Sequence, residues 1–141
     1  MLTESAKDDF WHADFSNMFI SRDIEDIPVS VKDLLNAIKD KPVTQLFLHD
    51  NAVGVRVVQR SDLLPFLQAN SQLVNINLSN CGLSKESMKL LFEDTLVNSE
   101  TKLKEIRISQ NALSGGEIPL SKYLQTYDSL EMLEIKGCRI Q

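Results

Sequence analysis

The chain has 141 residues, of which 43% are hydrophobic and 25% are charged, so it has the size and composition of one globular domain. Its formal net charge of −5 argues against a nucleic-acid-binding surface and is compatible with a basic partner. Two cysteines are too few for a disulfide framework, no apolar run approaches the length of a membrane span, and the first ten residues lack the features of a secretory signal.

The first expected element is a strand near 10–18, which carries a faint copy of a pattern that recurs later in the chain. It overlaps the stretch FSNMFISRDIEDIP (15–28), where a single arginine, Arg22, separates an apolar run from the acidic residues Asp23, Glu25 and Asp26. This composition predicts a strand, a loop and the start of a helix. Taken alone, Arg22 is more typical of an ordinary solvated loop position than of a functional site, and only the motif around it favours a functional role.

Four later segments share the template L-x-x-L-x-L-x-x-N/C-x-L and predict strands near 43–51, 73–81, 103–111 and 130–138. Their first residues are separated by 30, 30 and 27 positions, and the faint copy at Phe10 lies 33 positions before Val43. Alternate apolar residues such as Leu46 and Leu48 point inward, as period two requires. The N/C position is Asn51, Cys81, Asn111 and Cys138, and we expect these side chains to bond backbone groups where the chain leaves the sheet.

Helical periodicity occupies the segments between these strands, over 28–40, 61–70, 84–98 and 118–127, with Ser84 as an expected N-cap. A strand and a helix in every 27–33 residues predict an α/β fold: a leucine-rich repeat solenoid, or horseshoe, of the ribonuclease-inhibitor type. Its curved parallel sheet would line the concave face and its helices the convex face. We expect one domain over 1–141 with four to five repeats. The last template ends next to Ile140 and Gln141, so we also expect a fragment, a truncated form or an assembly that covers that end.

Three motifs in this order resemble the N-terminal part of the Ran GTPase-activating proteins. Residues 15–28 match the family segment W/F-S-D-M/I-F-T-G-R-x-x-x-E-I-P, the stretch LHDNAVG (48–54) matches L-S-D-N-A-F-G, and LSNCGL (78–83) matches L-N-N-C-G-M. Ile24 stands where the family often has a basic residue, and two family arginines are absent after Ile108. The resemblance covers about the first two thirds of the chain.

The resemblance implies help in trans for GTP hydrolysis by Ran, without an inserted arginine finger. Arg22 aligns with the family's functional arginine and would hold the partner, while Asn80 aligns with the asparagine that supports the GTPase's own glutamine. The residues expected to contact the GTPase are Asn17, Asp50, Asn51 and Gln110. Such a protein is a regulator rather than an enzyme in its own right, needs no cofactor, and acts in the cytoplasm or at the nuclear envelope in nucleocytoplasmic transport.

Two alternatives remain open. One is a non-catalytic leucine-rich repeat interaction module that has lost the activator site, which the missing arginines favour. The other is an inhibitor-like clamp that uses the sheet-face residues Asn75, Asn77, Glu105 and Arg107. No catalytic triad, phosphate loop or paired-carboxylate site is present in the sequence, and His12 and His49 have no Cys, Asp or Glu at metal-ligand spacing, so we expect no metal site.

Overall fold

The computed structural model describes residues 2–4, 10–19 and 22–139. Six strands form one sheet in chain order: β1 (Leu2–Glu4), β2 (Trp11–Asp14), β3 (Val43–Phe47), β4 (Asn75–Asn77), β5 (Glu105–Arg107) and β6 (Met132–Glu134). β1 pairs with β2 in antiparallel fashion, and the other four pairings are parallel. The α/β class and the parallel sheet are therefore confirmed, whereas the sequence did not indicate β1.

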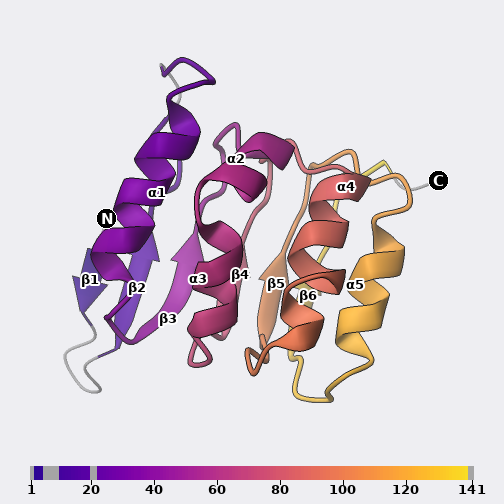
Figure 1. The fold of residues 1–141 in the computed structure, drawn as a ribbon. Coiled ribbons are helices and arrows are strands. Elements are labelled where there is room, and N and C mark those ends of the chain that lie inside the picture. The colour runs from indigo at the N-terminus through magenta and orange to yellow at the C-terminus, as the bar shows by residue number, and fades with distance from the viewer. Residues whose placement is uncertain (1, 5–9, 20–21, 140–141) are drawn as a thin grey trace.

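The helical elements cover one face of the sheet and leave the other face open (Figure 1). They are α1 (Ile27–Ile38), α2 (Gly54–Arg60), α3 (Leu63–Ala69), α4 (Lys85–Met88), the π-helical turn η1 (Lys89–Glu93), the 3-10 turn η2 (Leu96–Asn98) and α5 (Glu117–Leu124). Within the described part of the chain, no helix is long and apolar enough to cross a membrane.

The core lies between the sheet and these helices. Leu46, Ile76 and Ile106 are in register across β3, β4 and β5, and each is at most 1% exposed. Leucine and isoleucine at the same position of neighbouring strands thus pack against one another. A sequence period of about 30 residues predicts this arrangement, because it places equivalent residues side by side in a parallel sheet. Leu133 takes the corresponding position on β6 and is 37% exposed, because β6 is the edge strand of the described sheet.

Local sequence explains most helix positions. Pro28 occupies the first turn of α1, where no backbone donor is needed, and Ser84 caps α4 by accepting a hydrogen bond from the backbone N–H of Ser87. The segment 54–60 begins with glycine and carries three valines, so it has low helix propensity. It nevertheless forms α2, because Val57 and Val58 are buried against the rest of the core.

The expected helix over 84–98 is divided into α4, η1 and η2. Asp94 donates its backbone N–H to the carbonyl of Lys89 at 2.9 Å, a spacing of five residues that is typical of a π-helical turn. This turn accommodates one more residue than an α-helical turn while Leu91 and Phe92 remain buried. The apolar pattern therefore predicted the buried residues and the helical character of this segment correctly, but it did not predict the division into three short elements.

Candidate functional site

The parallel strands β2–β6 all end at one side of the sheet, and we call this side the rim. One residue at each strand end has a left-handed backbone conformation, with φ of 58° at Asn17, 61° at Asp50, 51° at Asn80, 57° at Gln110 and 66° at Gly137. Four of these residues donate their backbone N–H to the next repeat: Asn17 to His49, Asp50 to Ser79, Asn80 to Ser109 and Gln110 to Lys136, at 2.8–3.1 Å. Asparagine, aspartate and glycine tolerate this conformation best, so the chain turn itself favours them.

This geometry gives Asn80 a structural role beside the functional one that the resemblance implies. Asn80 directly precedes the N/C template position Cys81. The structure gives the backbone of Asn80 a conformation that selects for asparagine whether or not a partner binds. A test of its side chain must therefore preserve that conformation.

The N/C template positions act as expected. Asn51 accepts hydrogen bonds from the backbone N–H groups of Met18 and Phe19, both at 3.0 Å, and donates to the carbonyls of Phe15 and Leu48 at 2.8 and 3.0 Å. It is 4% exposed. Asn51 was also predicted to contact a GTPase, but its buried and fully bonded amide leaves it a supporting role below the rim.

Cysteine replaces asparagine in two repeats. The thiol of Cys81 donates to the Leu48 carbonyl at 3.1 Å, and that of Cys138 donates to the Ile108 carbonyl at 3.2 Å. Burial raises the pKa of the Cys81 thiol to about 12, so it stays protonated at neutral pH. These contacts fit the structural role predicted for both cysteines.

One open groove of about 630 Å³ brings together most of the predicted site. Asn17, Arg22, Asp50 and Asn80 all line it, although the sequence separates the first and last of them by 63 positions. Asn51 also reaches its wall. Gln110 lies apart, in a second groove of about 390 Å³ that it shares with Arg139. The structure therefore groups five of the six predicted residues and separates Gln110 from them.

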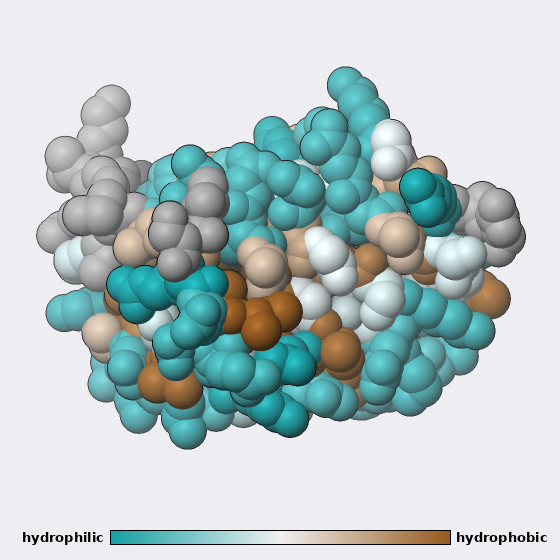
Figure 2. All heavy atoms as spheres, turned by 90° about the horizontal axis from the view of Figure 1, so that it is seen from above, coloured by the Kyte–Doolittle hydropathy of each residue, from teal (hydrophilic) through white to brown (hydrophobic). Residues whose placement is uncertain are grey.

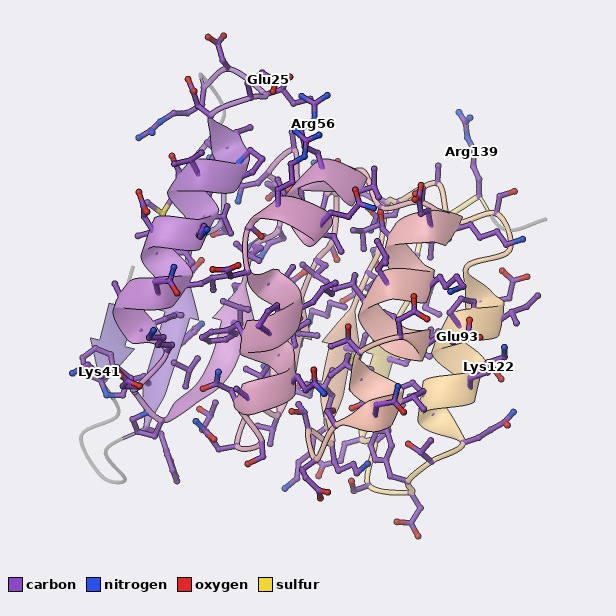
Figure 3. All side chains as sticks on the ribbon, in the orientation of Figure 1. Glu25, Lys41, Arg56, Glu93, Lys122 and Arg139 are labelled. Atoms are coloured by element: carbon purple, nitrogen blue, oxygen red, sulfur yellow. The ribbon has the colours of Figure 1, made fainter. Side chains whose placement is uncertain are left out.

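Arg22 is exposed and is the cation of this groove. Its guanidinium donates to the hydroxyl of Ser30 at 3.1 Å, which links the loop after β2 to the first turn of α1. Phe19, 3% exposed, is buried beneath the loop. Farther along, Glu25 forms an ion pair with Arg56 of α2, and both side chains meet above the helix ends in Figure 3. These contacts fix the part of the loop that presents Arg22.

Asn80 and Asp50 form a polar pair that also lines the groove. The side-chain N–H of Asn80 donates to a carboxylate oxygen of Asp50 at 3.0 Å, and the pair is exposed to solvent. The amide oxygen of Asn80 accepts no hydrogen bond from the described residues, so it is open to a donor on a partner. The groove thus offers a guanidinium, a carboxylate and an amide, which together can bind polar groups.

The structure adds apolar residues that the sequence did not point to. Ile24 and Ala52 line the groove beside Arg22, and Ile24 is 57% exposed. Only the departure of Ile24 from the basic residue common in the family singled it out in the sequence. Across the described ranges there is no cluster of three or more His, Cys, Asp and Glu side chains that could hold a metal ion.

The open sheet face is occupied by contacts within the chain. Arg107 lies 3.5 Å from Glu105, 3.4 Å from Glu134 and 3.3 Å from the amide oxygen of Asn75. Asn75 in turn donates to Glu105 and to Gln45. A clamp that used this face would have to break these pairs, so the face favours a partner less than the rim does.

Comparison with known proteins gives a structural likeness and no family. No family model matches the chain, and no curated protein matches it either. One similar solved structure is "Leiomodin-1 Actin-Binding Site 2 (ABS2)", with a TM-score of 0.56 and 18% sequence identity. The match covers 83% of this chain and 64% of that chain. At this identity the likeness concerns the fold.

Proposed function

We propose that the chain is a leucine-rich repeat solenoid of the ribonuclease-inhibitor type that activates GTP hydrolysis by the small GTPase Ran. Support for the repeat architecture comes from strand units at intervals of 27–33 residues, from the left-handed residue at each strand end, and from the Asn or Cys that follows it in four of the five repeats, buried at Asn51, Cys81 and Asn111. Support for the partner comes from the resemblance of residues 15–28, 48–54 and 78–83 to the Ran GTPase-activating proteins. The chain would act in the cytoplasm or at the nuclear envelope.

The observation that carries this proposal is the shared groove of Arg22 and Asn80. These two residues align with the family's two functional positions, and they line one surface although 58 positions separate them. In the proposed mechanism, Arg22 holds the GTPase against the rim while the amide of Asn80 positions the partner's glutamine. The glutamine then orients the attacking water, and the GTPase and its Mg²⁺ supply the remaining chemistry.

Two neighbours support this mechanism through their contacts. Asp50 holds one side of the Asn80 amide at 3.0 Å, so its carboxylate limits rotation of that side chain before a partner arrives. Asn51 holds the backbone of Met18 and Phe19 from below, so it supports the start of the loop that carries Arg22. We treat both as positioning residues.

The alternative is a non-catalytic interaction module. The left-handed backbone at Asn80 favours it, because that conformation explains the asparagine without a GTPase. The similar leiomodin-1 structure is described as an actin-binding site, which gives a precedent for this second candidate in a chain of similar fold. Actin itself is a partner to include in a binding test.

The test is single-turnover GTP hydrolysis by Ran with the chain added in excess. Asn80→Gly keeps the left-handed turn, since glycine already stands at the equivalent Gly137, and removes only the amide. We expect Asn80→Gly to lower the stimulated rate by about 100-fold and Arg22→Ala to weaken the complex. The matched control is Gln110→Gly, which makes the same type of change at the neighbouring strand end outside the groove.

One result would reject the activator function, and another would reject the role of Asn80. Lack of stimulation by the folded wild-type chain would favour the interaction module, and binding of Ran or actin without stimulation would identify its partner. Stimulation that Asn80→Gly and Gln110→Gly leave equally intact would remove the role given to Asn80.

A further inference from the structure

A third groove adjoins the groove of Arg22 and Asn80. Its volume is about 350 Å³, and it shares Ile24, Ala52 and Gly82 with the groove of Arg22 and Asn80. Val53, Val57 and Cys81 are buried at its base. We call it the apolar groove. Figure 2, which looks onto this end of the molecule, shows apolar side chains exposed among hydrophilic ones.

Ile24 is the unusual residue here. Single exposed apolar residues are common on protein surfaces and need no explanation. Val29 is such a case: it lies on α1, is 59% exposed and lines neither groove. Ile24 is 57% exposed but forms part of the wall of a hollow with an aliphatic base, so a side chain entering the hollow would cover Ile24 and its neighbours together.

The charges around the apolar groove are unequal. Arg56 contributes to its wall, but this guanidinium is paired with Glu25. Asp23, Asp26 and Asp50 add carboxylates in the same loop and on the neighbouring strand end, against the single cation of Arg22. The surroundings therefore have an excess of negative charge, which attracts lysine and arginine on a partner and repels acidic segments.

We propose that the apolar groove is a docking site for one large apolar side chain, flanked by lysine or arginine, on a segment of the partner protein. This inference rests on the proposed function in that the same partner would reach Arg22 and Asn80 through the adjoining groove. The apolar side chain acts as the anchor that fixes the position of the segment, and the surrounding basic residues determine which segments approach. An anchor enclosed by polar contacts is the usual arrangement at the energetic centre of an interface.

The Glu25–Arg56 pair has a defined part in this arrangement. It joins the loop that carries Ile24 to α2, which contributes Val57, so it favours the position in which the two walls enclose the groove. Both side chains are exposed, so the pair biases this position rather than fixing it. This bias lowers the free-energy cost of ordering the loop when a segment binds.

The direct test uses the full chain with labelled methyl groups and three synthetic peptides followed by NMR. The first is acetyl-Lys-Arg-Lys-Phe-Lys-Arg-Lys-amide, the second has Ser in place of Phe, and the third keeps Phe but has Glu in place of every basic residue. We expect the first peptide to shift the methyl signals of Ile24, Val53 and Val55 in a saturable way. Its affinity should exceed that of each of the other two by about tenfold or more.

Two variants make the test specific. Ile24→Ser should weaken binding of the first peptide by about fivefold or more, whereas Val29→Ser, an equally exposed change on α1, should alter it by less than about twofold. Equal binding of the Phe and Ser peptides, or methyl shifts confined to other parts of the chain, would overturn the proposal. So would equal effects of the two variants.

The peptide experiment separates this inference from the proposed function. If the chain binds the first peptide in the apolar groove but does not stimulate Ran, the docking site is supported and the activator function is rejected. If the chain stimulates Ran, and Ile24→Ser has the same rate and half-saturating concentration as the wild type, the activator function is supported and the docking site is rejected.

Discussion

Replacement of Asn51 by alanine is expected to be among the most damaging single changes in the chain. The oxygen of this amide accepts hydrogen bonds from two backbone N–H groups, and its nitrogen donates to the carbonyls of Phe15, Leu48 and, at 3.4 Å, His49. A buried donor left without a partner costs about 1–3 kcal/mol, whereas carbonyls tolerate the loss better. Phe19 is 3% exposed, so water cannot replace the amide at its N–H, while Met18 is 43% exposed and its N–H is partly compensated. We therefore expect Asn51→Ala to lower the free energy of unfolding by about 2–4 kcal/mol.

Urea unfolding measures this loss, followed by circular dichroism and by the fluorescence of Trp11, the single tryptophan. Asn51→Cys should give an intermediate loss, because a thiol already fills this position at Cys81 and donates to the Leu48 carbonyl. The control is Asn36→Ala, which removes an exposed amide from α1 and should change stability by less than about 0.5 kcal/mol.

The size of the effect tests the reasoning. A loss below about 1 kcal/mol for Asn51→Ala, with an unchanged dependence on urea, would mean that the hydrogen bonds of this amide do not carry the stability assigned to them. If Asn51→Cys were as damaging as Asn51→Ala, the equivalence of asparagine and cysteine at this position would be wrong.

Three further outcomes follow from the same structure. Gln110→Gly should raise the free energy of unfolding by about 0.5–1 kcal/mol in a urea titration, because relief of a φ of 57° outweighs the greater freedom of glycine in the unfolded chain. Cys81 should resist a thiol reagent at pH 8 until the chain unfolds, since burial raises its pKa to about 12, whereas the half-buried Cys138 should react faster. Burial opposes ionisation of Asp14, but the hydrogen bonds from the N–H and hydroxyl of Ser16 outweigh it and lower the pKa of Asp14 below 3.8. Its contribution is thus present above pH 3.8 and lost as the pH falls through the lowered pKa, so Ser16→Ala should cost about 1 kcal/mol at pH 7 and less below pH 3.

The sequence predicted the parallel strands well because they follow from a long-range period. Leu46, Ile76 and Ile106 occupy the same template position, and the structure pairs them in register. The roles of Asn51 and Asn111 were likewise predictable, because a buried amide at a fixed position in each repeat has backbone partners that repeat with it. The template could not reveal β1, which pairs in the opposite direction and has no place in the period.

The candidate site was predictable in its members but not in its shape. Sequence similarity pointed to Arg22 and Asn80, but a groove between them depends on how the loop after β2 lies against α2. That position rests on the Glu25–Arg56 pair, and nothing in the local sequence indicates that residues 31 positions apart should meet. The left-handed turn at Asn80 also depends on a bond to the carbonyl of Ser109 in the next repeat, and helix and strand patterns do not contain that information.

The row of left-handed residues at the strand ends allows side chains to change during evolution while the backbone turns are retained. At Asn17, Asp50, Asn80 and Gln110 the backbone bonds to the next repeat through its N–H, so side chains there can be exchanged within a small alphabet of Gly, Asn and Asp while the turn is retained. New binding preferences can therefore arise at these positions with little cost to the core. A library of three residues at four positions contains only about 80 sequences, which is small enough to screen completely for binding to candidate partners.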